Sequence, residues 1–513
     1  MNFARTDINP DQAHFPLAIS SISVNMSSPT PIYNQLCAAI RSAIMSGELP
    51  AGTMMPTSRE FAIALGVGRN TVNAAYSRLG AEGYLEAKFR RGTRVAPGHA
   101  SQNRTQSPSR DAHEVPMALE IDREIGIGYS AARTLRELVD IYGDALPLSP
   151  FAPDPTLFPR THFARLLSEK CGRAPLDDAG FDLGAEIKRF QNAVAIYLRR
   201  TNGIVCNPAQ ILPMASSESA IDLVARLTID AGHTVQMESP SCDIARAIFR
   251  NAGAHLYEIP RDSLGANPDL VVGPPARLIF VSPSLSFPFG VQMPEERRRR
   301  IVDHARASGA LILECDVDGE LLFTGARLKT IQSLEPNRVI YFGGFQSLLG
   351  PKIRVSYLVV PEAFVDPAVK LWRIVSQGPD QIVLSAITSF IEDGQFAVHC
   401  KKIRAIYSDR MSRLAQLCRE RIADAIVVEP RGGLHLALLL PSEIPSNLVY
   451  RIATRHKMGI LPLDRFCLST NKENGIVLGI GMCHDRHRDQ LVTRLSEIIR
   501  EAAQENASRT AAA

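Results

Sequence analysis

The stretch FGGFQSLLGPKIR, residues 342–354, decides the fold of the larger part of this chain. It continues the apolar run Val339-Ile340-Tyr341, which indicates a buried strand, and its adjacent glycines indicate a turn at the strand's end. Earlier runs of the same character lie at 210–214, 233–237, 276–281 and 310–314, and helical patterns lie between them at 218–229, 242–252 and 295–308. This alternation predicts an α/β domain with a mostly parallel sheet and helices on both faces.

The rest of the chain divides around this domain. With 513 residues it exceeds the roughly 250–300 residues over which one core usually extends. Residues 98–114, GHASQNRTQSPSRDAHE, are poor in apolar side chains and indicate a flexible linker, and the pattern at 134–142 predicts a short helix. We expect a flexible arm at 1–29, a head at 30–96, a linker at 97–150, the large domain at 151–390, a smaller α+β lobe at 391–503 and a flexible tail at 504–513.

Composition is that of an ordinary globular protein, with 45% hydrophobic and 21% charged residues. The net charge of +4 is too small to indicate a partner, so nucleic-acid binding must be argued from local charge. No apolar stretch is long enough for a membrane span. Nine scattered cysteines without a CxxC pair suit free thiols in a cytoplasmic protein. Cys483, His484 and His487 form the strongest metal candidate, but a polar helix start explains them better, and we expect no metal.

The head has the pattern of three short helices followed by a hairpin. Apolar residues recur every four positions from Ile32 to Ile44, and Thr57 with Glu60 forms a capping box. A three-residue glycine turn separates the second helix from a third that begins at Arg69. Strand candidates at 84–86 and 93–95 enclose a basic turn. This order predicts a winged helix-turn-helix.

The chemistry of the head suits nucleic acid. The exposed face of the third helix presents Asn70, Asn73, Ala74 and Ser77, and amides can make paired hydrogen bonds to adenine edges. The hairpin concentrates the cations Lys88, Arg90, Arg91 and Arg94, which suit phosphate contacts. The alternative to nucleic-acid binding is that the head is a small helical adaptor whose charged face is only solvated.

The head resembles the DNA-binding domain of GntR-family transcription regulators along its whole length. The resemblance is carried by Leu49-Pro50-Ala51-Gly52, Pro56-Thr57-Ser58-Arg59-Glu60, Arg69-Asn70-Thr71-Val72, Ala81-Glu82-Gly83-Tyr84-Leu85 and Gly92-Thr93. It implies DNA contacts by Arg59, Arg69, Thr71 and Gly92. Asn73 departs from the family pattern, because many relatives have a basic residue at this position. With the residues chosen above, the predicted DNA-binding set is Arg59, Arg69, Asn70, Thr71, Asn73, Lys88, Arg91, Gly92 and Thr93.

Residues 150–503 resemble a fold-type-I aminotransferase, so the whole chain resembles a MocR-type regulator. The resemblance is carried by Leu157-Phe158-Pro159, AIYLRR at 195–200, SPSLSFPFGVQMP at 282–294, the opening stretch and Gly432-Gly433-Leu434-His435. Typical members use pyridoxal phosphate as a sensor. The resemblance implies a homodimer, because the fold builds its cleft at a subunit interface.

Pyridoxal-phosphate chemistry needs an amine, a carboxylate at the ring nitrogen and a stacking aromatic ring. At the matching positions this chain has Ser347 for the Schiff-base lysine, Cys315 for the carboxylate and Cys242 for the aromatic residue. Val317 replaces the tyrosine that contacts the phenolic oxygen. Asp316 is one residue off the carboxylate position and should face the other side of the strand end.

The phosphate side of the site is only partly retained. Ser216 and Ser217 remain as donors at a helix N-terminus, but Glu218 follows them, and a negative charge there opposes a phosphate by about 1–4 kcal/mol. Arg354 matches the phosphate arginine, although a salt bridge to a nearby acid would explain it equally well. Val477 occupies the position of the arginine that binds a substrate carboxylate.

These replacements predict either a collapsed cleft or a drier pocket for a less polar effector. The predicted pocket comprises Ser216, Ser217, Cys242, Cys315, Val317, Ser347 and Arg354. We expect no catalytic residue and no covalent cofactor, with at most weak non-covalent binding of pyridoxal phosphate. The expected function is sequence-specific regulation of transcription by a homodimer, with an unknown small-molecule effector. The alternatives are an enzyme that uses a non-standard lysine, for which Lys352 after a proline is poorly placed, and a scaffold that only dimerises.

Overall fold

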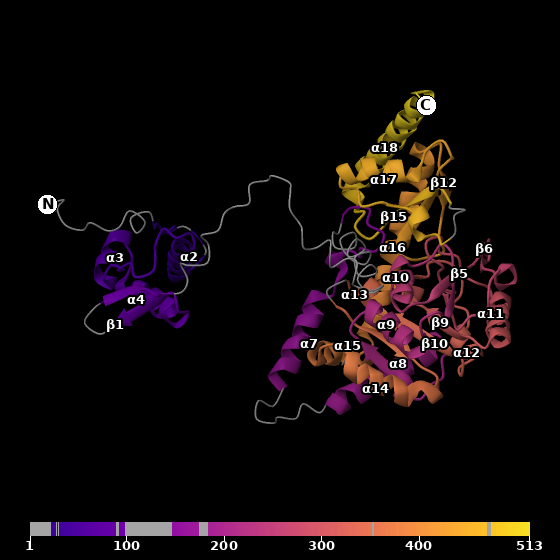
Figure 1. Ribbon diagram of the computed structural model, residues 1–513, viewed down its shortest axis with the longest axis horizontal. Helices are drawn as coiled ribbons and strands as arrows, with labels where there is room; N and C mark the ends of the chain where they lie inside the picture. Colours follow the sequence, from indigo (N-terminus) through magenta and orange to yellow (C-terminus); the bar gives the residue numbers. More distant parts are fainter. Residues whose placement is uncertain are drawn as a thin grey trace. The chain divides into compact units, whose positions relative to one another are not determined.

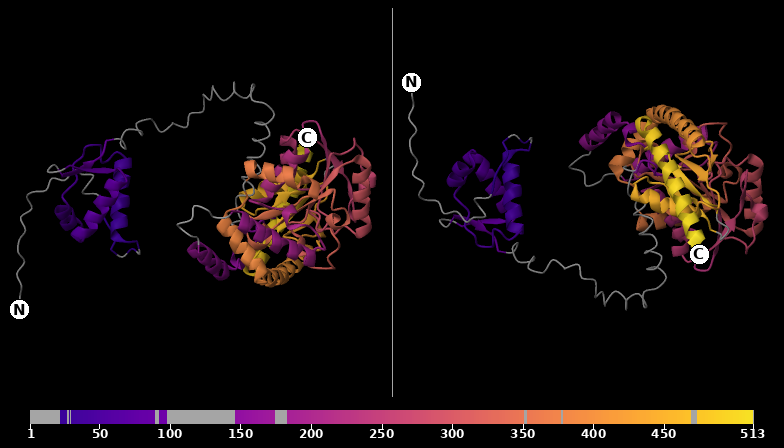
Figure 2. Two further views of the ribbon diagram at one scale, coloured as in Figure 1. Left: turned by 90° about the horizontal axis from the view of Figure 1, so that it is seen from below. Right: turned by 90° about the horizontal axis from the view of Figure 1, so that it is seen from above.

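The computed structural model describes residues 22–26, 28, 30–88, 92–97, 146–173, 183–350, 353–376, 378–468 and 473–512. Its contacts form two compact units, residues 1–120 and 121–513, and each is described by itself (Figures 1 and 2). The predicted helix at 134–142 lies outside the described residues, as do Arg90, Arg91 and Lys352.

The head consists of the predicted three helices and hairpin. They are α2 (Ile32–Met45), α3 (Ser58–Leu65), α4 (Arg69–Ala81), β1 (Leu85–Lys88) and β2 (Gly92–Val95). The capping box at the start of α3 is present, since the Thr57 side chain accepts from the Glu60 amide and the Glu60 carboxylate accepts from the Thr57 amide. Gly66 ends α3 in the left-handed conformation, with φ of 66°, and this turns the chain into α4.

The boundary of the predicted arm needs correction. Ile22 is buried in the core of the head, together with Leu36 and Val72. The Gln35 side chain holds this segment, because it bonds to the Asn25 amide at 2.9 Å and to the Thr30 carbonyl at 2.7 Å. Residues 22–26, 28 and 30 are therefore part of the head, whereas residues 1–21 lie outside the described part of the chain.

The second unit contains a seven-stranded sheet in the order β3-β11-β10-β9-β8-β4-β5. Its strands are β3 (Ile211–Met214), β4 (Thr234–Glu238), β5 (His255–Ile259), β8 (Leu278–Val281), β9 (Leu311–Cys315), β10 (Val339–Gly344) and β11 (Ser356–Val359). All neighbours are parallel except β11, which is antiparallel to both β10 and β3. This confirms the predicted mostly parallel sheet, and its nearly continuous apolar strands are typical of a sheet buried on both faces.

Helices cover both faces of this sheet (Figure 1). One face packs on α9 (Ser217–Thr228), α10 (Asp243–Asn251) and α14 (Val365–Val375). The other packs on α8 (Leu183–Thr201), α11 (Glu295–Ser308), α12 (Ile331–Leu334), α15 (Gln381–Glu392) and α16 (Gln395–Arg421). The alternation within β9 shows how the two cores form, because Leu311 and Leu313 face the first set of helices and Ile312 faces α11.

The C-terminal lobe is built on a second, antiparallel sheet in the order β12-β13-β15-β14. The elements after α16 are β12 (Ile426–Val428), β13 (His435–Leu439), α17 (Ser446–Arg455), β14 (Leu461–Pro462), β15 (Gly475–Gly479) and α18 (Asp485–Ala512). The predicted flexible tail is helical, because α18 continues to Ala512. Glu505 pairs with Arg451 of α17 at 2.6 Å, which fixes this last part of the helix to the lobe.

The end of the predicted linker also belongs to the lobe. Leu148 is fully buried, and its backbone bonds to Met458 at 2.9 Å and to Gly479 at 2.7 Å. Gly479 has no room for a side chain, since a Cβ there would lie 1.9 Å from the Ser149 carbonyl oxygen. We call residues 146–153 the clasp.

The remaining elements carry little periodic signal in the sequence. They are α7 (Arg160–Arg173), β6 (Arg261–Asp262), β7 (Gly265–Ala266), α13 (Gln346–Leu349) and the 3-10 helices at Pro155–Leu157, Pro208–Gln210, Pro268–Leu270, Gly319–Leu321, Glu362–Phe364 and Leu463–Phe466.

Candidate functional site

The third helix of the head presents the predicted polar face. Val72, Ala75 and Leu79 are buried in the head's core, and Asn70 and Asn73 are exposed. Ala74 and Ser77 are also exposed, as predicted, and Thr71 is half-buried. The amide side chains of α4 are therefore available to a partner.

Two arginines at the starts of α3 and α4 differ from the other described cations of the head. Arg59 and Arg69 are exposed, and no ion pair joins either of them to another described residue. Within the described part of the chain, the Arg69 side chain makes one hydrogen bond, which its Nε donates to the Ser58 hydroxyl at 3.3 Å. By contrast, Arg41 and Arg78 both pair with Glu82, which raises their pKa values. Two exposed guanidinium groups without an ion pair among the described residues thus lie near the starts of α3 and α4.

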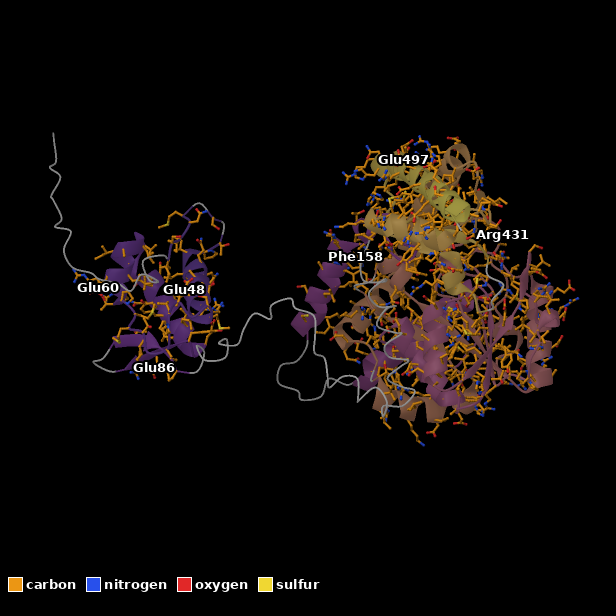
Figure 3. All side chains as sticks on the ribbon, turned by 45° about the horizontal axis from the view of Figure 1, so that its top comes forward. Glu48, Glu60, Glu86, Phe158, Arg431 and Glu497 are labelled. Atoms are coloured by element: carbon orange, nitrogen blue, oxygen red, sulfur yellow. The ribbon has the colours of Figure 1, made fainter. Side chains whose placement is uncertain are left out.

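The hairpin is a short antiparallel wing that pairs Leu85 with Val95 and Lys88 with Gly92. Gly92 has φ of 79°, which an ordinary side chain rarely adopts, and the Thr93 carbonyl accepts from Met55 at 2.9 Å. Arg94 does not add a free charge, contrary to the sequence argument, because it forms an ion pair with Glu86 across the hairpin. Glu60 and Glu86 are labelled on the head in Figure 3.

The second unit contains a cavity of about 310 Å³ at the carboxyl ends of its parallel strands. Residues from the end of β9, the end of β10 and the starts of α9 and α10 line it. The cleft is therefore open and not collapsed. Of the predicted pocket residues, it brings together Ser217, Cys242, Cys315, Val317, Ser347 and Arg354.

Ser216 is the exception and does not line the cavity. Its hydroxyl accepts from the Ser219 amide at 3.1 Å, so it caps α9. The Ser217 hydroxyl does lie at the cavity, but it donates to the Gln346 side chain at 2.8 Å. Val477 is buried in the core of the C-terminal lobe with Phe289 and Leu461, so it is not a wall residue either.

Asp318 is the most consequential wall residue that the sequence argument missed. It follows β9 and lies against Ser347, and burial raises the pKa of its carboxyl group, an effect that the Ser347 hydroxyl partly offsets. One carboxylate oxygen, Oδ1, is buried without a hydrogen-bond partner among the described residues. Its position three residues after the end of the parallel strand β9 was the available signal, because ligands of such sheets bind at the carboxyl ends of the strands.

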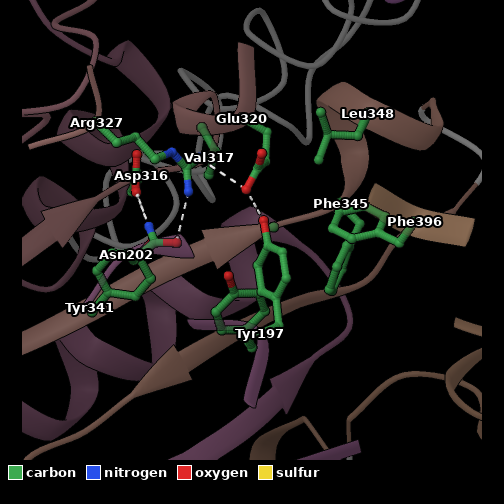
Figure 4. A pocket seen from close by; sticks show the side chains of 12 residues that line it. Tyr197, Asn202, Asp316, Val317, Glu320, Arg327, Tyr341, Phe345, Leu348 and Phe396 are labelled. Atoms are coloured by element: carbon green, nitrogen blue, oxygen red, sulfur yellow. Dashed lines mark hydrogen bonds and ion pairs between the residues drawn. The ribbon is translucent and has the colours of Figure 1, made fainter. Parts of the chain in front are cut away.

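Asp316 lies between this cavity and a second one of about 10 Å³, which has room for about one water (Figure 4). Its Oδ2 accepts from the Tyr341 hydroxyl at 2.7 Å and from Asn202 at 3.0 Å. Asn202 in turn accepts from Arg327 at 2.8 Å, and Arg327 pairs with Glu320 at 3.0 Å. The carboxylate thus faces the far side, as predicted, but it also forms part of the cavity wall.

Two cysteines and Arg354 also line the cavity. Burial raises the pKa of Cys242 to about 12 and that of Cys315 well above its ordinary value, so neither is a thiolate nucleophile at neutral pH. Arg354 is exposed and lines the cavity, and no salt bridge joins it to another residue in the described part of the chain. The wall also includes aromatic residues that the sequence did not mark, namely Phe151, Phe280, Phe287 and Phe342.

The described residues contain no group of three His, Cys, Asp or Glu side chains arranged to hold a metal ion. None of their helices is both long enough and apolar enough to span a bilayer.

Comparison with known proteins identifies both parts of the chain. Residues 32–95 match the family described as "Bacterial regulatory proteins, gntR family". The probable rhizopine catabolism regulatory protein MocR of Rhizobium meliloti is 30% identical over 466 residues, covering 89% of this chain and 91% of MocR. The pyridoxine biosynthesis transcriptional regulator PdxR of Corynebacterium glutamicum is 29% identical and covers 94% of this chain and 98% of PdxR.

The second unit has the fold of an aminotransferase. The kynurenine aminotransferase of Pyrococcus horikoshii matches with a TM-score of 0.65 and 20% identity, covering 75% of this chain and 99% of that protein. At this identity the match establishes the fold alone. Together with the head and the full-length relatives, it shows that the chain belongs to the MocR-type GntR family of transcription regulators.

Proposed function

We propose that this regulator binds DNA through its head, dimerises through its aminotransferase-like unit, and senses a small effector without covalent chemistry. The observation that carries the sensing role is the open cavity in which Ser347 lies against Asp318. The proposed DNA contacts are Arg59, Arg69, Asn70, Thr71, Asn73, Lys88, Arg91, Gly92 and Thr93. A cytoplasmic location follows from this role.

The wall of the cavity does not fit pyridoxal phosphate as a covalent group. A hydroxyl beside a carboxyl group replaces the amine, and Cys315 is a neutral thiol where a carboxylate would keep the ring nitrogen protonated. The phosphate end is also poor, since the Ser216 and Ser217 hydroxyls are engaged and Glu218 lies at the cavity. We therefore propose that the unit is not an enzyme.

The absence of a covalent adduct can be tested directly. The protein is incubated with pyridoxal phosphate and reduced with borohydride, and its intact mass is measured. We expect no added mass beyond that of a lysine-rich control protein treated identically. Stoichiometric labelling of one lysine, located by peptide mapping, would contradict the proposal and favour an enzyme or a covalent sensor.

Sequence-specific DNA binding is tested by footprinting on the promoter region of the protein's own gene. We expect protection that survives competitor DNA, because the exposed amides of α4 suit base edges. Asn73→Ala should relax the preference at one base pair and leave binding to non-specific DNA unchanged. Equal protection of unrelated DNA would contradict the proposal.

Dimerisation is tested by light scattering on the purified protein. The resemblance to a fold that builds its cleft between subunits supports a dimer, and two heads would then read two half-sites. A monomeric mass at micromolar concentration would contradict this part of the proposal and leave DNA binding by one head intact.

A further inference from the structure

Two thiols share the wall of the cavity. Cys315 is the last residue of β9, and Cys242 directly precedes α10 as its N-cap. Both line the cavity and neither is fully buried, so a molecule inside the cavity can reach them. All nine cysteines of the chain lie in its described part, and these two alone line the cavity.

The sheet brings the two cysteines together. Only β8 separates β4, which leads to α10, from β9, and Phe280 of β8 lines the cavity with both cysteines. All three residues belong to, or pack against, one apolar cluster. Cys242 also raises the pKa of Cys315 more than Asp316 or Asp318 does, although both carboxyl groups are closer in the chain. Because electrostatic influence falls with distance, this order agrees with two thiols that lie side by side.

Both thiols are free and protonated. Neither cysteine forms a disulfide, and burial raises the pKa of both thiols, that of Cys242 to about 12. Reagents that need a thiolate should therefore react slowly with them at neutral pH. A ligand that bonds to both sulfur atoms must instead displace two protons as it binds.

The rest of the wall favours an uncharged product with an apolar body. Phe280, Phe287 and Phe342 line the cavity, and an isolated charge among such groups is costly. Sulfur ligands prefer soft acceptors. Two sulfur atoms bonded to one trivalent arsenic that also carries a carbon group form a neutral unit. The volume of about 310 Å³ is at the lower end of the range for small-molecule sites and suits one compact carbon group.

We infer that Cys242 and Cys315 form a dithiol site that binds a trivalent organoarsenical through both sulfur atoms, with the carbon group against the phenylalanines. Two As–S bonds form as the bonds between arsenic and its oxide oxygen break. The two thiol protons leave with that oxygen as one water molecule, and arsenic stays trivalent, so no oxidant is needed. The inference rests on the open cavity of the proposed function and names a class of ligand for it.

Phenylarsine oxide is the probe that tests the inference. The full-length protein is reduced, freed of reductant, mixed with the probe and then with excess glutathione, and its intact mass is measured under native conditions. We expect one phenylarsenic group per chain in place of two hydrogen atoms. The adduct should survive glutathione, a single thiol, and be released by dithiothreitol, because two linked bonds are displaced together only by another dithiol. No adduct, or an adduct that glutathione removes, overturns the inference.

Single substitutions locate the adduct. Cys242→Ser and Cys315→Ser should each weaken binding about a hundredfold, because one sulfur atom cannot form the bridge. Loss of either sulfur suffices, so one of these variants that folds, as judged by circular dichroism, decides the question.

Two control variants exclude other cysteines. Cys171→Ser removes an exposed thiol outside the cavity, and it should bind the probe as the unaltered protein does. Cys418→Ser disrupts the competing pair, since Cys483 raises the pKa of Cys418, but both of these thiols are buried in the hydrophobic core. Loss of the adduct in either control, or its retention in Cys242→Ser or Cys315→Ser, would contradict the assignment.

The outcomes separate this inference from the proposed function. Failure to retain phenylarsine oxide would reject the dithiol site and leave the proposed DNA binding and effector cavity in place. Loss of sequence-specific footprinting would instead reject the regulatory role, whatever the two cysteines bind.

Discussion

Arg59 and Arg94 carry the same charge on the same head but face different surroundings. Arg59 is exposed, and no ion pair joins it to another described residue, whereas Arg94 is paired with Glu86 across the wing. A paired cation must give up its partner before it neutralises a phosphate. The two arginines should therefore contribute unequally to the salt dependence of DNA binding.

This difference gives the first prediction. Arg59→Gln should weaken binding to all DNA sequences and reduce the slope of log K against log salt by about one, because one phosphate contact is lost. Arg94→Gln is the matched control and should change that slope by clearly less. The slopes are measured by fluorescence anisotropy at several salt concentrations. Equal slopes for the two variants would show that the ion pair with Glu86 does not reduce the contribution of Arg94 to DNA binding.

His435 gives a prediction about pH. It is buried with its Nε2 unpartnered among the described residues, and its ring lies 4.6 Å from that of Phe287. Burial lowers the pKa of His435 from 6.5 to about 4. Because the folded-state pKa is the lower one, the unfolded chain binds the proton first as pH falls. The free energy of unfolding is therefore unaffected by this group above pH 6.5. It falls by roughly 3 kcal/mol as the pH is lowered from 6.5 toward 4.

The free energy of unfolding of the second unit is measured at pH 7 and pH 4.5 for the natural protein and for His435→Gln. We expect the variant to lose less stability between the two pH values, since it has no imidazole to protonate. An identical loss in both proteins would mean that His435 is already charged, or solvated, in the folded state.

At the scale of elements, the clasp shows what patterns in the sequence cannot reveal. Residues 146–153 form no regular helix or strand, and no periodic pattern separates them from the residues that precede them in the sequence. Their order comes from contacts with Met458 and Gly479, which lie more than 300 positions away in the chain. Long-range contacts of this kind leave no local signal.

The clasp leads to a prediction. Gly479→Ala should destabilise the second unit by about 1–3 kcal/mol, because its Cβ would lie 1.9 Å from the Ser149 carbonyl oxygen and the backbone must shift. Gly80→Ala is the control, since the nearest atom to a Cβ there is 3.7 Å away. Chemical denaturation gives the free energy of unfolding of each variant. An unchanged value for Gly479→Ala would show that the clasp moves aside without loss of stability.

Most regular elements were predictable because they carry their own signals. The helix at 295–308 was predicted with its observed bounds, and the capping box at Thr57 fixed the start of α3. The candidate site was predictable only where a family motif marked it, as at Ser347 and Arg354. Asp318 was missed because the importance of its carboxylate depends on burial and on Ser347, which follows 29 positions later.

At the scale of the whole molecule, the head and the second unit have separate cores. Ile22, Leu36 and Val72 belong to a cluster that contains residues of the head alone. The two units should therefore unfold independently, in two thermal transitions. Thr57→Ala removes a helix cap and should lower the melting temperature of the head by the equivalent of about 1 kcal/mol. Gly479→Ala should lower the melting temperature of the second unit.

Differential scanning calorimetry of the full-length protein checks this prediction. We expect each variant to move one transition and leave the other in place. A single cooperative transition that both substitutions lower would show that the two cores depend on each other.

The position of Asp318 beside Ser347 also bears on how this protein can evolve. A lysine introduced at 347 would meet a buried carboxyl group and form an ion pair with it, which raises the pKa of the amine and keeps it protonated. A protonated amine is no nucleophile. A lysine at this position would therefore not supply a nucleophile in one mutational step, because Asp318 would first have to change.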